Sequence, residues 1–461
     1  MKHLGLNSLG EVAQALGVAA PAEASCRLDT ITTDTRALGA DALFVALRGE
    51  RFDGHDFLAQ ARAAGAAAAV VEHPVDDPLP QLVVSDTRLA LGLLGLARRR
   101  AWGQASAGRL AAITGNSGKT SVKEMLATLL SQRGATLATR GNLNNDIGAP
   151  LTLLELRSEH RQAVVELGAN HLGEIAWTTS LACPDVAVIT NVTGAHVGEF
   201  GGMGQIAQAK AEILAGLGPD GVAVLNRDDR FYPVWRQLAG EREVMDVSLE
   251  HGRARVCAGA LACDELGRYA FTLSFDGREL GRVQLALLGR HSVGNALLAA
   301  AAALAMGLDD GAVLAGLAAV APMPGRMAVV EGLRGTRLID DTYNANPGAV
   351  MAALDALADM PGPRWCLLGA MGELGEASAR LHAEVGRHAQ EKGIDFLGTT
   401  GDAAREAATA CGAAGCHFDD WEALARHAHN HLPPGASVLV KGSRSAGMER
   451  VIAVLRADAS R

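Results

Sequence analysis

The sequence lacks the features that mark several large classes of protein. Its seven cysteines are irregularly spaced and include no Cys-x-x-Cys pair, which argues against disulfides and against a zinc site. The longest basic run is the arginine triplet at 98–100, which we expect to end a helix on a solvated face. With a formal net charge of −9, nothing in the composition favours binding to nucleic acid.

Long apolar segments are also missing. The amino-terminal stretch has no apolar signal core, and the most apolar predicted helix, at 295–308, is too short to span a bilayer. We therefore predict a soluble, cytoplasmic protein with no membrane span, and we expect it to act as a monomer.

The chain is long enough for several domains. Its 461 residues are 49% hydrophobic and 20% charged, which is ordinary for a globular protein and predicts about three domains. We expect an α/β fold throughout, with a small domain at 1–83, a central domain at 84–320 and a smaller one at 321–461. The proline-rich stretch 74–80 indicates the first boundary, and 322–325 indicates a hinge at the second.

Strand and helix signals alternate through the central segment. The strands are predicted at 110–114, 163–167, 185–191 and 222–226, with helices at 119–131 and 204–216. This alternation predicts a parallel sheet wrapped by helices. Residues 244–288 show period-2 runs with a turn at 276–277, which predicts antiparallel hairpins added to that sheet. A similar alternation after residue 336 predicts a second, Rossmann-like α/β domain.

One motif stands out in the central segment: Gly115-Asn116-Ser117-Gly118-Lys119-Thr120-Ser121, between an apolar strand and a helix. Loop N–H groups and the positive end of the helix dipole make such a turn a phosphate site. Lys119 would reach the outer phosphates and Thr120 would hold Mg²⁺. The common P-loop needs a glycine at the position of Ile113, so this shorter form indicates a narrower set of ATP users. The alternative is a glycine-rich turn at a helix start.

Polar residues follow the central strands and lie on one later helix. Glu166 ends an apolar strand, and His196 follows the strand at 185–191. Together with Thr120 they form a set that can ligate Mg²⁺ bridging ATP phosphates, although each taken singly is more often an ordinary strand-end residue. Periodicity alone places Lys210 on a solvated helix face.

A loop rich in asparagine, within residues 139–148, comes after a strand. Asn142, Asn144 and Asn145 lie between two glycines and supply side-chain donors and acceptors suited to a peptide-like ligand. A loop of Asx turns is an equally good interpretation.

The chain offers four further candidate contacts for a nucleotide. Asn295 either reads a base edge or belongs to ordinary helix-start chemistry. Arg326, just past the expected hinge, suits bidentate contact with phosphate. Asp341 either holds ribose hydroxyls or caps the helix that follows it. The loop 441–444, between a strand and a helix, is a second anion-binding setting.

Together these motifs resemble the Mur ligase family, which builds the peptide stem of the peptidoglycan precursor with ATP. The resemblance covers essentially the whole chain, and its stretches are 33–36 with 51–57, 141–145, 341–347, and 441–444 ahead of Met448-Glu449. The first is shared with the member that adds the third stem residue, but the Asn-rich loop and the Tyr-Asn-Ala-Asn-Pro run indicate the member that adds a dipeptide. One departure is Thr35, where serine is more usual and a hydroxyl is retained.

This resemblance implies a reaction. ATP activates UDP-N-acetylmuramoyl-tripeptide as an acyl phosphate, and D-alanyl-D-alanine attacks it to give UDP-N-acetylmuramoyl-pentapeptide, ADP and phosphate. Catalytic roles are implied for Lys119, His196, Lys210 and Arg326. Lys210 resembles a lysine that family members carbamylate, which turns a cation into a carboxylate-like ligand for Mg²⁺ beside Thr120, Glu166 and His196.

The resemblance also implies binding roles. The loop 115–121 would hold ATP phosphates, while Asn295, Arg326 and Asp341 would contact adenine, phosphate and ribose. The N-terminal domain would hold the uridine nucleotide. The implied substrate-binding residues are Thr33, Asp34, Arg36, Asp53, His55, Asn142, Asn144, Asn145, Asn344, Asn346, Lys441, Ser443 and Arg444.

Three alternatives stay open at this point. Another Mur ligase or an enzyme of the folylpolyglutamate synthase type would use the same short P-loop and acyl-phosphate route, although the latter does not need the uridine-type N-terminal domain. A nucleotide-dependent switch would bind ATP without forming a bond. The residues do not decide whether the tripeptide ends in diaminopimelate or lysine.

Overall fold

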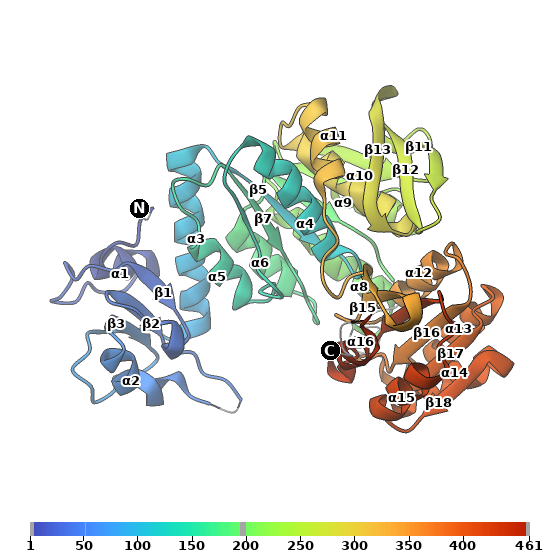
Figure 1. Cartoon of the computed structure of the whole chain (residues 1–461). Helices are drawn as coiled ribbons and strands as arrows, with labels where there is room; N and C mark the ends of the chain where they lie inside the picture. Colours follow the sequence, from blue (N-terminus) through green and yellow to red (C-terminus); the bar gives the residue numbers. More distant parts are fainter. Residues whose placement is uncertain (1–3, 51, 194–199, 458–461) are drawn as a thin grey trace.

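The computed structural model describes residues 4–50, 52–193 and 200–457. Over these ranges the strands form three sheets of four, nine and six strands, one in each of the three predicted segments. Figure 1 shows the N-terminal and C-terminal parts on opposite sides of the central part. The α/β fold class is therefore confirmed, while the residue limits of the domains stay a prediction.

The N-terminal sheet is parallel throughout, in the order β1-β2-β3-β4. Its strands and helices are β1 (Thr30–Thr32), β2 (Ala42–Val45), β3 (Ala66–Val71), β4 (Gln81–Val83), α1 (Leu9–Leu16) and α2 (Leu58–Ala63). The proline-rich stretch 74–80 was expected to be a boundary, and that is wrong: it joins β3 to β4, which pair as neighbours (Ala69 with Gln81). The prolines form a loop inside the domain.

Helix α3 (Thr87–Ser106) stands between the N-terminal and central parts (Figure 1). Asp86 caps its amino end, because the Asp86 side chain accepts hydrogen bonds from the backbone N–H groups of Arg88 and Leu89. Its arginine triplet does not end the helix on a solvated face, as expected, because α3 packs against elements on both sides. Arg98 and Arg99 are buried, with 2% and 8% of their surface exposed, and only Arg100 is exposed. Arg99 donates to the carbonyl oxygens of Ala182 and Cys183, each at 2.9 Å.

The central sheet has the order β13-β12-β11-β10-β9-β8-β5-β7-β6. Its strands are β5 (Arg109–Thr114), β6 (Thr136–Ala138), β7 (Gln162–Glu166), β8 (Val186–Ile189), β9 (Val222–Asn226), β10 (Glu243–Ser248), β11 (Val256–Cys263), β12 (Arg268–Phe275) and β13 (Arg278–Leu288). The antiparallel addition is confirmed for β11, β12 and β13. It begins later than predicted, since β10 still pairs in parallel with β9, and β11 in parallel with β10.

Helices cover both faces of the central sheet. One face carries α4 (Lys119–Leu130), α10 (Arg290–Ala305) and α11 (Asp310–Ala319), and the other carries α5 (Gly148–Leu154), α6 (Glu174–Ala182), α8 (Met203–Ala211) and α9 (Tyr232–Leu238). Alternation along β5 explains this, because Ala111 and Ile113 face the first helix layer while Leu110 and Ala112 face the second.

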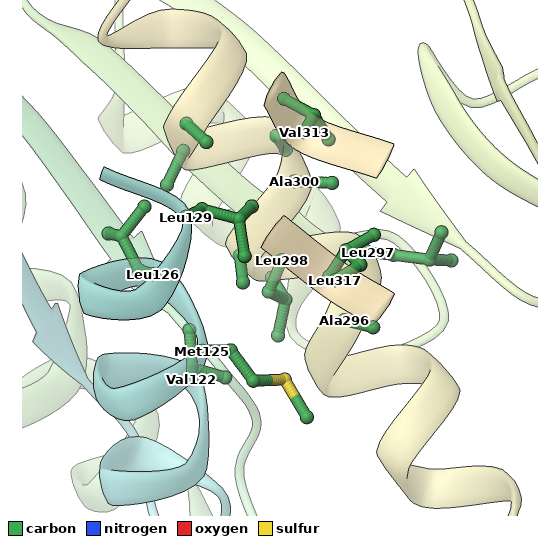
Figure 2. Close-up of a cluster of buried hydrophobic side chains, with 14 of the residues drawn as sticks. Val122, Met125, Leu126, Leu129, Ala296, Leu297, Leu298, Ala300, Val313 and Leu317 are labelled. Atoms are coloured by element: carbon green, nitrogen blue, oxygen red, sulfur yellow. The ribbon is translucent and has the colours of Figure 1, made fainter. Parts of the chain in front are cut away.

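Figure 2 shows the packing in the first helix layer. Val122, Met125, Leu126 and Leu129 of α4 meet side chains of α10 and α11, and all four are fully buried. Full burial of such a side chain stabilises the fold by roughly 1.5–3 kcal/mol. The first turn of α4 carries the phosphate-loop residues, so this packing holds the end of the helix that faces the site.

The C-terminal sheet is parallel except at its first edge, in the order β14-β15-β19-β16-β17-β18. Its strands are β14 (Ala328–Glu331), β15 (Arg337–Asp341), β16 (Arg364–Gly369), β17 (Phe396–Thr400), β18 (Gly415–Phe418) and β19 (Ser437–Lys441). Its helices are α12 (Pro347–Ala358), α13 (Ser378–Glu391), α14 (Arg405–Cys411), α15 (Trp421–His431) and α16 (Glu449–Leu455).

Among the helices of the described ranges, none has the length and the apolar character that crossing a membrane requires.

Candidate active site

The phosphate loop is built on two glycines with left-handed φ angles. Gly115 has φ +143° and Gly118 has φ +80°. A Cβ at Gly115 would lie 1.9 Å from Oγ1 of Thr190, so no larger residue fits. Thr190 Oγ1 donates to the Ser117 carbonyl at 2.7 Å, and Asn191 Oδ1 accepts from the Ser117 N–H at 3.0 Å. The end of β8 thus shapes the loop.

Lys119 begins α4 and lies back across the loop. Its Nζ donates to the carbonyl oxygens of Gly115 at 2.8 Å and Asn116 at 3.2 Å. Burial lowers the pKa of this lysine below its usual value. The amino end of α4 and the Lys119 ammonium therefore place positive charge at one point of the cleft, which suits an anion.

Glu166 ends β7 as a buried carboxylate with two hydrogen-bond partners. Oε2 accepts from Thr120 Oγ1 at 2.8 Å, and Oε1 accepts from Asn144 Nδ2 at 2.8 Å. A carboxylate beside a hydroxyl is the hard oxygen donor set that Mg²⁺ prefers, with phosphates and waters completing its shell. No group of three or more His, Cys, Asp or Glu side chains suited to a metal occurs among the described residues. His196, the other expected ligand, lies outside them.

Lys210 on α8 is buried, and the expectation of a solvated side chain is wrong. Only 2% of its surface is exposed, because the helix packs against the sheet and Ala209 and Ala211 are buried with it. Nζ lies 5.2 Å from the Phe200 ring centroid and donates to the Ala169 carbonyl at 3.4 Å. Burial, aided by the positive charge of Lys119, lowers its pKa to about 7.

Residues of the C-terminal part contact the phosphate loop directly. Arg326 Nη2 donates to Thr120 Oγ1 at 2.9 Å, and its guanidinium lies 4.1 Å from the Tyr343 ring centroid. Asn346 Nδ2 donates to Ser117 Oγ at 3.1 Å. Residues of the central and C-terminal domains, which are far apart in the sequence, therefore form the site together.

Asp341 ends β15 and pairs with Lys441 at the end of the neighbouring strand β19. The Nζ–Oδ2 distance is 2.5 Å, and Nζ also donates to the Asn344 carbonyl at 2.9 Å. The suggestion that Asp341 caps the next helix is wrong, since Asn346 caps α12 by accepting from the Ala349 N–H. The carboxyl ends of parallel strands are where such sheets bind ligands.

These groups line one cleft of about 770 Å³. The predicted site residues that line it are Asn116, Ser117, Gly118, Lys119, Thr120, Ser121, Asn142, Asn144, Glu166, Lys210, Asn295, Arg326, Asp341, Asn344, Asn346, Lys441 and Arg444. Asn295 belongs to the interior of α10 rather than to its start, and its Oδ1 lies 2.5 Å from where a Cβ of Gly118 would be.

Asn145 and Ser443, two predicted substrate contacts on the loops of this cleft, do not line it. Asn145 Oδ1 accepts from the Gly148 N–H at 2.8 Å, as in the Asx-turn interpretation. Ser443 Oγ donates to the Ala370 carbonyl at 2.7 Å. Both side chains hold loops whose other residues line the cleft.

A second cavity, of about 450 Å³, lies on the N-terminal part. Thr33, Asp34 and Arg36 line it, together with the exposed aromatic ring of Phe52. Asp34 and Arg36 form an ion pair at 2.8 Å, and the hydrogen bonds from Arg36 lower the pKa of Asp34 to about 2. An aromatic ring beside charged and hydroxyl groups suits a nucleobase with its sugar phosphates.

Asp53 and His55 do not line this cavity, but they belong to the turn that carries two of its lining residues, Gly54 and Phe57. His55 Nε2 accepts from the Glu72 N–H at 2.8 Å, so Nδ1 carries the proton and donates to Asp53 at 2.5 Å. A Cβ at Gly54 would lie 2.7 Å from the Leu47 carbonyl oxygen. The pair fixes the turn at 53–57 that carries Phe57 to the cavity wall.

Comparison with known proteins identifies the family of this chain. Residues 27–92 match the catalytic domain of the Mur ligase family, 113–303 match the Mur ligase middle domain, and 325–444 match the Mur ligase, glutamate ligase domain. The UDP-N-acetylmuramoyl-tripeptide–D-alanyl-D-alanine ligase of Escherichia coli K12 is 45% identical over 94% of this chain and 95% of its own length. The chain belongs to the Mur ligase family.

Solved structures of Mur ligases agree over the same length. A crystal structure of MurF from Acinetobacter baumannii has a TM-score of 0.90 and 38% identity, covering 98% of this chain and 99% of that one. MurF from Thermotoga maritima, crystallised with ADP, has a TM-score of 0.81 and 29% identity over 92% of this chain. This Mur ligase therefore has the three-domain fold of its family.

The sequence did not single out several residues of the Mur ligase cleft. Thr190 and Asn191 shape the phosphate loop, Tyr343 stacks on Arg326, and His291 and Glu373 line the cleft. Thr190 and Asn191 follow an apolar strand that lies beside the P-loop strand, and this position at a strand end could have indicated a role for them. No sequence pattern indicates a role for Glu373, because its place in the cleft depends on how two domains meet.

Proposed function

We propose that this Mur ligase joins D-alanyl-D-alanine to UDP-N-acetylmuramoyl-tripeptide at the expense of ATP, releasing ADP and phosphate. The observation that carries this assignment is the shared cleft, in which Arg326 of one domain donates to Thr120 of another beside the phosphate loop. The 45% identity to the E. coli ligase of that name over nearly the whole chain favours this dipeptide over other amines.

ATP fits the cleft between the central and C-terminal domains. The phosphate loop and Lys119 would hold the phosphates, Asn295 would contact the base, and Asp341 with Arg326 would contact ribose and phosphate. Residues 116–121 of the loop, Asn295, Arg326 and Asp341 line the cleft. The Thermotoga relative was crystallised with ADP, which supports a nucleotide at the corresponding site.

Mg²⁺ would be held by Thr120 and Glu166, and His196 is proposed as a further ligand. When bound, it would offset the negative charge of the phosphates. Lys210 is proposed as a carbamylated residue, because a buried amine with a pKa of about 7 is partly neutral at physiological pH and can add to CO₂. The carbamate carries negative charge, so it would replace a buried cation by a ligand for the metal.

The residues of the cleft suit two successive displacements. The tripeptide carboxylate attacks the γ-phosphorus of ATP, giving an acyl phosphate and ADP, and Lys119 and Arg326 offset the charge on the transferred group. The dipeptide amine then attacks the acyl carbon and phosphate leaves. An acyl phosphate hydrolyses in water, so a cleft closed between two domains protects it.

The N-terminal cavity would bind the uridine nucleotide of the first substrate. Phe52 and Phe57 would contact the ring, and Thr33, Asp34 and Arg36 would contact the polar groups. The Asn-rich loop would then contact the peptide between the two sites, through Asn142 and Asn144. We propose that the enzyme acts in the cytoplasm, where ATP is supplied, and as a monomer, because one chain supplies both walls of the cleft.

The test is phosphate release from Mg-ATP with UDP-N-acetylmuramoyl-tripeptide, with and without D-alanyl-D-alanine. We expect release that requires both substrates, with a pentapeptide product identified by mass. Lys119→Ala should abolish turnover, whereas Lys392→Ala, a surface lysine paired with Asp355, should not. Turnover with another amine but not this dipeptide would move the enzyme elsewhere in the family, and ATP binding without turnover would refute the ligase.

A further inference from the structure

Two adjoining loops form the C-terminal wall of the interdomain cleft. One, residues 370–374, follows β16, and the other, residues 442–445, follows β19. Glu373 and Arg444 line the cleft from these loops. The loops are tied together, since both the N–H and the Oγ of Ser443 donate to the Ala370 carbonyl, at 3.2 and 2.7 Å.

The first loop is fixed so that Glu373 stays at the cleft surface. Met371 and Leu374 are buried on either side of it, and the Met371 N–H donates to Nε2 of buried His382 at 3.0 Å. Glu373 is exposed, with φ +62°, a left-handed conformation that costs a non-glycine residue on the order of 1 kcal/mol or more. Strain held in place by buried neighbours is typical of residues positioned for function.

Among the described residues, three carboxylates line this cleft, and each comes from a different element. Asp341 is paired with Lys441, and Glu166 accepts from Thr120 and Asn144. Glu373 comes from the C-terminal wall, close enough to the phosphate loop for its charge to act on Lys119. Glu373 is thus a carboxylate of the C-terminal wall whose charge reaches the phosphate loop.

Arg444 provides the opposite charge on the second loop. Its side chain is 71% exposed, and its ion-pair partner Glu449 lies at 3.7 Å, beyond hydrogen-bond distance. A guanidinium in this setting has donors available for a ligand carboxylate, which it can bind in bidentate fashion.

We propose that Glu373 binds the ammonium group of the incoming dipeptide and Arg444 binds its carboxylate, so that the two loops select a short zwitterionic peptide. This inference rests on the proposed function. Before it reacts, D-alanyl-D-alanine carries one charge of each sign at its two ends, which the two loops complement. The charge of Glu373 acts on Lys119 of the phosphate loop, so the end that must reach the acyl phosphate is the end that the carboxylate holds.

The first test compares two nucleophiles. Hydroxylamine is uncharged at neutral pH and has no carboxylate, and it traps the acyl phosphate as a hydroxamate. We expect Glu373→Gln to lower kcat/KM for D-alanyl-D-alanine at least tenfold relative to that for hydroxylamine. Glu376→Gln, an exposed glutamate three residues along that does not line the cleft, should leave this ratio unchanged.

A second variant separates the loss of the carboxylate from a loss of folding. Glu373→Gly deletes the same carboxylate and suits the left-handed backbone, so it should fold at least as well as the wild type and change the ratio in the same way. An equal loss with both nucleophiles in the two variants would overturn the role of Glu373. Wild-type enzyme that forms hydroxamate but no pentapeptide would instead overturn the proposed function.

The role of Arg444 is tested with the C-terminal amide of the dipeptide. Wild-type enzyme should prefer the free acid at least tenfold, and Arg444→Gln should bring the two substrates to within about threefold of each other. Arg380→Gln, an arginine of the same domain paired with Glu384 on the surface, is the matched control. Persistence of the full preference for the acid in Arg444→Gln would overturn this half of the proposal.

Discussion

Thr120 Oγ1 accepts a hydrogen bond from Arg326 at 2.9 Å and donates one to Glu166 at 2.8 Å. One hydroxyl therefore connects a guanidinium of the C-terminal domain to a carboxylate of the central domain. Because the same hydroxyl follows the P-loop lysine, the contact between the domains is made at the phosphate site itself. Residues of both domains therefore lie at the phosphate site.

Arg326 should be more sensitive to a conservative change than a surface arginine. Arg326→Lys keeps the charge but loses the planar fork and the stacking on Tyr343, and we expect kcat to fall by about 100-fold. Tyr343→Phe keeps the ring and should stay within about twofold of wild type, whereas Tyr343→Ala should lose roughly tenfold. Phosphate release under saturating substrates measures each effect, and equal activities of the Phe and Ala variants would contradict the stacking role.

Lys210 should act through a carbamate. We expect Lys210→Ala to lose most activity and to recover part of it when formate or acetate is added, because a small carboxylate can enter the vacated space. Wild-type enzyme in ¹³C-bicarbonate should show a carbamate carbon signal by NMR that Lys210→Ala lacks. Lys392→Ala should behave as wild type in both assays. A wild-type spectrum without that signal, together with failed rescue, would assign Lys210 a role as a plain cation.

The buried Lys210 should also make stability depend on pH. Its folded-state pKa of about 7 is below the ordinary value of 10.5, so the unfolded chain binds more protons between these values and stability rises with pH across that window. The cost of burial is therefore largest at pH 7 and below. In CO₂-free buffer, Lys210→Met should raise the unfolding free energy near pH 6.5, by at most roughly 5 kcal/mol at about 1.4 kcal/mol per pH unit.

Urea unfolding near pH 6.5 and near pH 10 measures this difference. The gain from Lys210→Met should be much smaller near pH 10 and should vanish well above pH 10.5, where the wild-type lysine is neutral in both states. The same gain at both pH values would contradict the lowered pKa.

Gly115 should tolerate no side chain. Gly115→Ala would bring a Cβ within 1.9 Å of Thr190 Oγ1 at a φ of +143°, so the loop must move away from β8. We expect nucleotide binding to weaken at least tenfold by calorimetric titration. Gly259→Ala, on β11 with open space around it, should bind nucleotide as the wild type does. Wild-type affinity in Gly115→Ala would show that the loop is not held as described.

Local patterns were sufficient where the chemistry lies within one short segment. The order strand, glycine-rich turn, lysine, helix predicted the phosphate loop, and the structure places that loop at the end of β5 and the start of α4. Period-2 runs around the turn at 276–277 likewise predicted the antiparallel pair β12 and β13. Backbone geometry and hydrophobic alternation act over a few residues, so the sequence shows them directly.

The pattern failed where burial depends on a distant partner. Arg98, Arg99 and Lys210 carry charges that sequence reasoning places in solvent, yet all three are buried because other elements pack over their helices. The proline-rich stretch 74–80 has the composition of a linker, but the pairing of β4 with β3 keeps it inside a domain. Neither packing partner nor strand order can be read from the local composition.

What the sequence determined by itself was the set of chemical groups: a phosphate loop, a strand-end glutamate, an asparagine-rich loop and the motifs shared with Mur ligases. Only the tertiary structure decided which of them meet. It brought Arg326 to Thr120 across 206 positions of sequence, lowered the pKa of Lys210 by burying it, and set Glu373 and Arg444 on one wall. The reason is physical, since the distances and the local dielectric that govern such groups are set by packing between domains.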